Sequence, residues 1–192
     1  FRIGALSGLS KNLQLKILGD VIAIPTLELH LEVGDAPNLV QRLIHYKLDA
    51  LLLDTALPHS ATEPLVQREI ASERVCLVSR NKSKKKDLKQ YASHGFYLPA
   101  QSSPMTAELV EYLNSEMKSP LIRGYIDDIA FLRLLALQTD ALVAIPKIGV
   151  QREIDAKELF VVHEFARIKQ AYFIVYRLHG KRHPLVNHLL NR

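Results

Sequence analysis

The feature that most constrains the fold is an alternation of short apolar segments with longer amphipathic segments over residues 2–53. The short segments have the length and composition of strands, and the longer ones repeat apolar residues at helical spacing. Strands are predicted at residues 2–6, 27–33 and 50–53, with helices between them at 11–22 and 35–45. This order is typical of a parallel sheet whose crossover helices cover its faces. The first part of the chain is therefore predicted to be α/β.

The predicted strands differ in their expected burial. Segment 27–33 alternates apolar and polar residues, which predicts one buried face and one wet face, as at a sheet edge. Its apolar residues are Leu27, Leu29, Leu31 and Val33. Segment 50–53 is continuously apolar up to Asp54, which predicts a strand buried on both faces. Ser10 and Asp35 are predicted to cap the two helices.

A second α/β unit is predicted after a proline-containing loop at residues 55–64. Its elements are strands at 65–70, 75–78, 96–98, 121–125 and 141–145, with helices at 104–117 and 128–139. After Pro146 we expect a short helical stretch at 148–154, strands at 159–163 and 170–176, and a final helix from Pro184. The chain is thus predicted to hold two similar α/β units.

Composition excludes several classes of protein. With 192 residues, 48% of them hydrophobic, the chain can bury one sizeable core or two small ones. It has no apolar run of about eighteen residues and no secretory signal pattern, so we expect a cytoplasmic protein without membrane contact. Cys76 is the single cysteine, which excludes an internal disulfide and fits a reducing compartment.

The basic excess behind the formal net charge of +5 lies in two segments, residues 74–92 with seven basic residues and one acidic residue, and residues 177–192 with four basic residues and none acidic. A phosphate-contacting patch and a solvated loop are both possible interpretations. No aromatic residue interleaves before Tyr91 and no recognition helix follows, so the solvated loop is favoured. The cluster comprises Arg80, Lys82, Lys84, Lys85, Lys86 and Lys89.

The chain lacks the common catalytic motifs. It has no Gly-x-Ser-x-Gly elbow, no His-Glu-x-x-His pair and no glycine-rich phosphate loop. Cys76 lies in an apolar strand, where a thiol is usually inert packing. Three histidines near the C-terminus have no accompanying carboxylate, which favours a solvated helix end over a metal site: His179, His183 and His188. We therefore expect no catalytic residue and no cofactor, and metal binding stays undecided.

Polar residues at the carboxyl ends of strands are the best candidates for a ligand site, because backbone N–H groups and helix dipoles converge there. One turn, Ser7-Gly8-Leu9-Ser10, joins the first strand to its helix, and a second, Gln101-Ser102-Ser103, does the same in the second unit. The carboxylates best placed to reach such a site are Asp54 and Asp127, with Asp128 beside it. Ordinary capping and turn formation is the open alternative for all of these residues.

Two helices are more apolar than the surface of a monomer requires. In helix 11–22, Leu15, Leu18 and Ile22 lie on nearly the opposite face from a first apolar stripe, and one core does not easily cover both. Segment 129–137 has one charged residue, Arg133. Deep burial and pairing with another chain are both open interpretations.

In the order of its elements the chain resembles the C-terminal effector-binding domain of LysR-type transcriptional regulators. Four stretches carry the resemblance: Phe1-Arg2-Ile3-Gly4-Ala5-Leu6-Ser7, Leu43-Ile44-His45-Tyr46-Lys47-Leu48-Asp49-Ala50-Leu51-Leu52-Leu53, Glu73-Arg74-Val75-Cys76-Leu77-Val78 and Ala141-Leu142-Val143-Ala144-Ile145-Pro146. The resemblance spans essentially the whole chain. Residues 46–54 and 124–128 look closest to the branch that activates sodium/proton antiporter genes.

The resemblance implies two Rossmann-like subdomains joined by a two-strand hinge, as in type 2 periplasmic binding proteins. Subdomain I would comprise residues 1–73 plus 148–192, and subdomain II residues 74–147. An effector would bind in the cleft through Ser7–Ser10 and Gln101–Ser103, and our own reading adds Asp54 and Asp127. If the antiporter branch is right, the effector is sodium, lithium or a proton. No enzymatic activity is implied.

The resemblance also implies a homodimer in which the first helix meets a helix of the partner's second subdomain. Its expected contacts are Leu15, Leu18, Ile22, Leu132 and Leu135. The full-length protein would bind DNA through an N-terminal winged helix-turn-helix that we expect to be absent from this chain, with a tetramer as an alternative assembly. Two rival functions remain open: a solute-binding protein of a transport system, and a two-domain enzyme.

Overall fold

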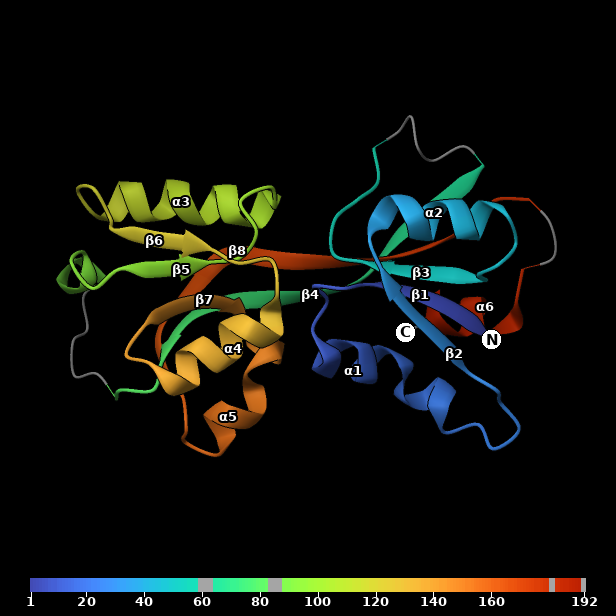
Figure 1. Ribbon diagram of the computed structural model, residues 1–192, viewed down its shortest axis with the longest axis horizontal. Helices are drawn as coiled ribbons and strands as arrows, with labels where there is room; N and C mark the ends of the chain where they lie inside the picture. The colour runs from blue at the N-terminus through green and yellow to red at the C-terminus, as the bar shows by residue number, and fades with distance from the viewer. Residues whose placement is uncertain (59–63, 83–87, 180–181, 191–192) are drawn as a thin grey trace. The chain divides into compact units, whose positions relative to one another are not determined.

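The computed structural model describes residues 1–58, 64–82, 88–179 and 182–190 (Figure 1). It divides the chain into two compact units, the first comprising Phe1–Ser72 and Ala171–Arg192 and the second Glu73–Gln170. Two long strands, β4 (Leu65–Ser79) and β8 (Phe160–Arg177), each run through both units. Two strands thus link the units, as the predicted two-strand hinge requires.

Unit 1 has the predicted strand-helix order. Its elements are β1 (Arg2–Leu6), α1 (Lys11–Ile22), β2 (His30–Gly34), α2 (Ala36–Ile44), β3 (Ala50–Leu53) and α6 (Pro184–Leu190). The strands lie in the order β2-β1-β3-β8, with β1 parallel to β2 and β3, and β8 antiparallel to β3. The parallel sheet expected from the sequence is confirmed.

The sheet of unit 1 is covered on both faces. Helix α2 lies on one face and α1 on the other (Figure 1). Under α2, Leu39, Leu43 and Leu51 form a buried cluster with Val175 of β8. Asp35 caps α2, because its carboxylate accepts a 3.0 Å hydrogen bond from the Asn38 backbone N–H.

The predicted burial of segment 27–33 is wrong in part. Strand β2 does lie at the sheet edge, but Leu31 and Val33 are 43% and 47% exposed. Their register neighbours on β1, Ile3 and Ala5, are fully buried. Neighbouring residues in register point to the same face of a sheet. Helix α1 therefore covers that face over β1 and stops short of the edge strand.

Unit 2 also has its strands covered by helices on both sides. Its strands lie in the order β4-β7-β5-β6, where β5 is Phe96–Leu98, β6 is Ile122–Tyr125 and β7 is Leu142–Pro146. Its helices are α3 (Pro104–Glu116), α4 (Ile129–Gln138) and α5 (Gln151–Asp155), with short 3₁₀ turns at Leu88–Tyr91 and Lys147–Gly149. Successive residues of β4 enter two different cores, since Leu77 packs with Leu109 of α3 while Cys76 packs with Leu132 of α4.

The structure corrects the expected strands and the expected second boundary. Segments 65–70 and 75–78 form one strand, β4, and segments 159–163 and 170–176 form one strand, β8. Residues 148–170 were expected in the first subdomain but belong to unit 2. The reason is packing, because Val150 and Leu159 are buried in the same cluster as Ile145. No helix in the described part of the chain is long and apolar enough to span a membrane.

Two glycines of unit 1 offer a test of this packing. A Cβ built on Gly4 would lie 2.8 Å from Leu51 Cδ2 and 2.9 Å from Leu39 Cδ2, whereas a Cβ on Gly19 of α1 would meet nothing within 4 Å. Gly4→Ala should lower the free energy of unfolding by about 1–3 kcal/mol through overpacking. Gly19→Ala should raise it by up to about 1 kcal/mol, because alanine favours a helix interior. Urea unfolding monitored by circular dichroism measures both changes. A Gly4→Ala variant as stable as the wild type would contradict this packing.

Candidate functional site

The turn after β1 is the first candidate in unit 1. The Ser7 N–H donates a 3.1 Å hydrogen bond to the Gly34 carbonyl, which ties the turn to the end of β2. Ser10 occupies the N-cap of α1, but its hydroxyl makes no capping bond. Leu9 and Ser10 are buried, whereas Ser7 is exposed and Gly8 is half-buried. The groups of this turn that a ligand can reach are therefore those of Ser7 and Gly8.

Asp54 lies at the same end of the sheet. It follows β3, whose Leu52 is in register with Ala5 of β1, so Asp54 and Ser7 extend neighbouring strands. Burial raises the pKa of the Asp54 carboxyl above its ordinary value, and a 3.4 Å hydrogen bond from the Thr55 hydroxyl opposes this shift only weakly. The site residues predicted for unit 1 thus share one end of the sheet.

The candidates of unit 2 line a common hollow. Gln101, Ser102 and Asp127 surround it together with Ala100 and Tyr125, and these five residues define what we call the Asp127 hollow. The hollow lies beyond the carboxyl ends of two parallel strands, since Leu98 of β5 is in register with Tyr125 of β6. The structure therefore brings Asp127 together with Gln101 and Ser102, which lie about 25 positions earlier in the sequence.

The two neighbouring aspartates have different roles. The Asp128 carboxylate accepts hydrogen bonds from the Ala130 and Phe131 N–H groups, at 2.7 and 3.3 Å, and caps α4. Asp127 lines the hollow, and its carboxylate has no hydrogen-bond or ion-pair partner within the described ranges. Ser103 takes the N-cap position of α3 without a side-chain capping bond and does not line the hollow. Asp128 is therefore a capping residue, whereas Asp127 is not.

Tyr125 is a lining residue that sequence reasoning did not select. Its side chain is 38% exposed. It stands at the carboxyl end of β6, two positions before Asp127. Its position at the end of a parallel strand was the available signal.

The residues expected at a dimer interface are only partly accessible. Leu15 and Ile22 of α1 are 63% and 49% exposed, and Leu135 of α4 is half-buried. Leu18 and Leu132 are buried in their own units, so the expectation that they face a partner is corrected. The buried stripe of each helix is wider than the sequence pattern indicated. On α4 the large apolar side chains that are exposed are instead Phe131 and Leu134.

The described residues give no candidate metal site, and the cysteine thiol is buried. The Cys76 thiol is buried, its Sγ lies 3.6 Å from the Ile145 carbonyl oxygen, and burial raises its pKa to about 12. Such a thiol stays protonated at neutral pH and is a poor nucleophile. Among the described residues, no three His, Cys, Asp or Glu side chains form a group that could hold a metal ion. Lys84, Lys85 and Lys86 of the basic cluster lie outside the described residues.

Comparison with known proteins identifies the family. Residues 1–192 match the family model described as the LysR substrate binding domain, and the chain belongs to this family. None of the curated proteins matches the chain.

Solved structures share the fold at low sequence identity. The reduced regulatory domain of OxyR2 from Vibrio vulnificus has a TM-score of 0.75 at 17% identity, covering 98% of this chain and 91% of that one. The regulatory domain of MexT, a transcriptional activator in Pseudomonas aeruginosa, has a TM-score of 0.75 at 15% identity, covering 100% and 96%. Full-length HypT from Salmonella typhimurium, a hypochlorite-specific LysR-type regulator, has a TM-score of 0.68 at 16% identity, covering 98% of this chain and 64% of that protein.

The chain is therefore an effector-binding regulatory domain of a LysR-type transcriptional regulator, with the periplasmic-binding-protein-like α/β fold. The family resemblance drawn from the sequence is confirmed at this level. Regulators of this type bind small-molecule effectors and act as oligomers with DNA. A transport solute-binding protein is not favoured, because the family that matches is one of transcriptional regulators.

The raised pKa of Asp54 makes a prediction about stability. Because the folded-state pKa lies above the ordinary value of 3.8, the stability that the protonated carboxyl contributes is fully present below pH 3.8 and is lost as the pH rises through the folded-state pKa. Asp54→Asn, which stays neutral, should therefore gain stability relative to the wild type as the pH rises from 3.8 to neutrality. Urea unfolding across this pH range measures the difference. A difference that does not change with pH would show that the Asp54 carboxyl is not shifted by burial.

Proposed function

We propose that this domain senses a small molecule or a cation at the carboxyl ends of its parallel strands and passes the signal to a DNA-binding domain. The candidate contacts are Ser7, Gly8 and Asp54 in unit 1, and Gln101, Ser102 and Asp127 in unit 2. The observation that carries this proposal is the Asp127 hollow, which gathers side chains with unused hydrogen-bonding capacity where open α/β sheets bind ligands.

Signal transfer needs an effector that prefers one conformational state. An effector shifts an equilibrium only by the difference between its affinities for the two states. A coupling free energy of about 1–3 kcal/mol is typical of such regulation. β4 and β8 are the segments through which a change in one unit would reach the other, because they alone in the described chain belong to both. No bond-making chemistry is required.

The lining of the Asp127 hollow favours a cation or a ligand rich in hydrogen-bond donors. It offers the Asp127 carboxylate, the Gln101 side-chain carbonyl, and hydroxyl oxygens from Ser102 and Tyr125, and no Lys or Arg side chain lines it. Oxygen ligands of this kind suit hard cations such as sodium or lithium, which need several of them. The further step, activation of sodium/proton antiporter genes, is supported by the resemblance at residues 46–54 and 124–128.

A thermal-shift panel tests the effector class. Sodium and lithium are compared with potassium at matched ionic strength, beside amino acids, sugars and small carboxylates. A ligand at a hundred times its Kd should stabilise the domain by about 2.7 kcal/mol. At this chain length the corresponding rise in Tm is roughly 5–10 °C. Asp127→Asn should abolish the rise caused by the effector.

The matched control is Glu111→Gln, which removes a carboxylate from an exposed position on α3 outside the hollow. It should leave the effector-induced rise in Tm unchanged. A rise with one organic compound and none with cations would discard the cation proposal and keep the effector site. A rise that survives Asp127→Asn would place the effector elsewhere.

We also propose a homodimer built on the exposed apolar side chains of α1 and α4. Leu15 and Ile22 of one chain would pack against Phe131 and Leu134 of its partner. Exposed large apolar residues grouped on one helix mark protein contact surfaces. DNA binding and any tetramer would belong to the full-length regulator.

Charge introduced at this surface should weaken the dimer. Leu15→Glu and Phe131→Glu each place a carboxylate in an apolar contact, so we expect dimerisation to weaken by at least roughly tenfold. Sedimentation velocity over a concentration series measures the change. Leu178→Glu, at an exposed leucine that belongs to neither helix, is the control and should leave assembly unaffected. A Leu15→Glu protein that dimerises like the wild type would rule out α1 as the contact.

A further inference from the structure

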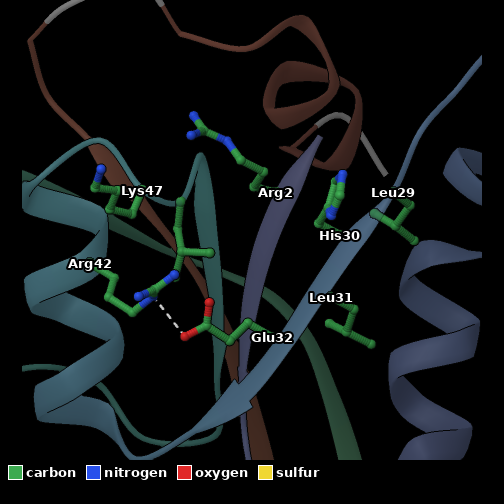
Figure 2. Close-up of a pocket in the computed structure, with 8 residues that line it drawn as sticks. Arg2, Leu29, His30, Leu31, Glu32, Arg42 and Lys47 are labelled. Atoms are coloured by element: carbon green, nitrogen blue, oxygen red, sulfur yellow. Dashed lines mark ion pairs between the residues drawn. The ribbon is translucent and has the colours of Figure 1, made fainter.

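Besides the Asp127 hollow of unit 2, the structure has a hollow in unit 1. It lies at the opposite end of the strands from Ser7–Ser10. It has a volume of about 540 Å³ and lies between α2 and β2, at the amino ends of β1 and β2 (Figure 2). We call it the amino-end hollow. Three cations, one histidine, one carboxylate and three leucines line it, the polar residues being Arg2, His30, Glu32, Arg42 and Lys47. The effector site proposed above uses none of these residues.

The cations of the amino-end hollow retain free hydrogen-bond donors. Arg2 donates Nη2–H to Asp49 Oδ1 at 2.8 Å and Nε–H to Asp49 Oδ2 at 3.3 Å. Arg42 Nε lies 2.7 Å from Glu32 Oε1 in an ion pair, and Figure 2 shows this pair across the hollow. Each guanidinium carries five N–H donors, so both arginines keep three or more for another acceptor.

Lys47 supplies a positive charge that no carboxylate neutralises. Its ammonium group forms no ion pair with any residue that the structure describes. Arg2 and Arg42 are paired with Asp49 and Glu32, and the Glu28 carboxylate lies 3.0 Å from His30, so Lys47 is the lining group whose charge has no partner of its own among the described residues.

The turn that carries Lys47 is held in a defined conformation. Tyr46 has a φ of 59°, in the left-handed region that costs a non-glycine residue energy. Arg177 secures it, because its Nη1 donates 2.7 Å hydrogen bonds to the Leu43 and Leu48 carbonyls and its guanidinium stacks 4.3 Å from the centre of the Tyr46 ring. The Arg177 charge also offsets the negative end of the α2 dipole, which would otherwise repel an anion.

We propose that the amino-end hollow binds a small organic anion. Its carboxylate or phosphate group would lie between Lys47 and the free N–H groups of Arg42. The volume of the hollow falls within the range typical of small-molecule sites. The Arg42–Glu32 pair is no obstacle, because its side chains are 48% and 39% exposed and such pairs contribute little.

An NMR titration of the ¹⁵N-labelled 192-residue chain tests the proposal. The probes are benzoate, succinate and inorganic phosphate, each compared with chloride at matched ionic strength. At least one probe should shift the amide resonances of residues 29–32 and 42–48 saturably. Lys47→Met and Arg42→Met should each weaken this binding by roughly tenfold or more, as expected for loss of a charged hydrogen bond.

Two control variants separate binding from folding. Lys47→Arg keeps the charge and should retain most of the affinity, whereas Lys118→Met, on exposed surface of unit 2, should have no effect. A spectrum with the dispersion of the wild type shows that each variant is folded. The proposal is overturned if none of the three probes shifts these resonances saturably, or if Lys47→Met binds as tightly as the wild type. Neither result bears on the effector site, which Asp127→Asn tests separately.

Discussion

Burial of the sheets on both faces is the constraint on which the rest of this structure depends. In unit 1, α1 and α2 cover opposite faces of β1 and β3, and in unit 2 alternate residues of β4 enter cores on opposite sides. Polar chemistry is therefore confined to the ends and edges of the strands, because a buried polar group without a partner is costly. The Asp127 hollow lies at carboxyl ends, the amino-end hollow at amino ends, and the exposed Leu31 and Val33 on an edge. Each candidate surface of the domain occupies one of the few positions that the packing leaves open.

Local pattern was sufficient to predict most of the elements. Strand β1 and helix α1 have the predicted bounds, and so does β5, because apolar periodicity and short polar turns mark both ends of each. The boundary at residue 148 was wrong for a reason that no local pattern contains. The sequence pattern predicted that the second unit ends at Pro146, but Val150 and Leu159 pack in the same core cluster as Ile145. Where a segment packs depends on contacts between residues far apart in sequence, and a single sequence does not display them.

The candidate site was predictable in position and less so in detail. The rule that ligands bind at the carboxyl ends of parallel strands selected Gln101, Ser102 and Asp127, which the structure brings to one hollow. The same rule could not distinguish Asp127 from Asp128, because only the hydrogen bonds from Ala130 and Phe131 show which carboxylate serves as the cap. Leu18 and Leu132 failed as interface residues for a related reason. Helical spacing defines a stripe, but the width of the buried part of that stripe is set by the neighbouring elements.

Charge illustrates most clearly why the arrangement of residues matters more than their totals. A net charge of +5 suggests a general affinity for anions, yet the Asp127 hollow is lined by a carboxylate and neutral groups with no basic side chain. The amino-end hollow, in the other unit, holds three cations of which two are already paired. Coulomb interactions between exposed groups are screened within about 10 Å at 0.1 M salt, so a ligand responds mainly to the few charges that line its own site. Two hollows with different charged groups can therefore coexist in one small domain.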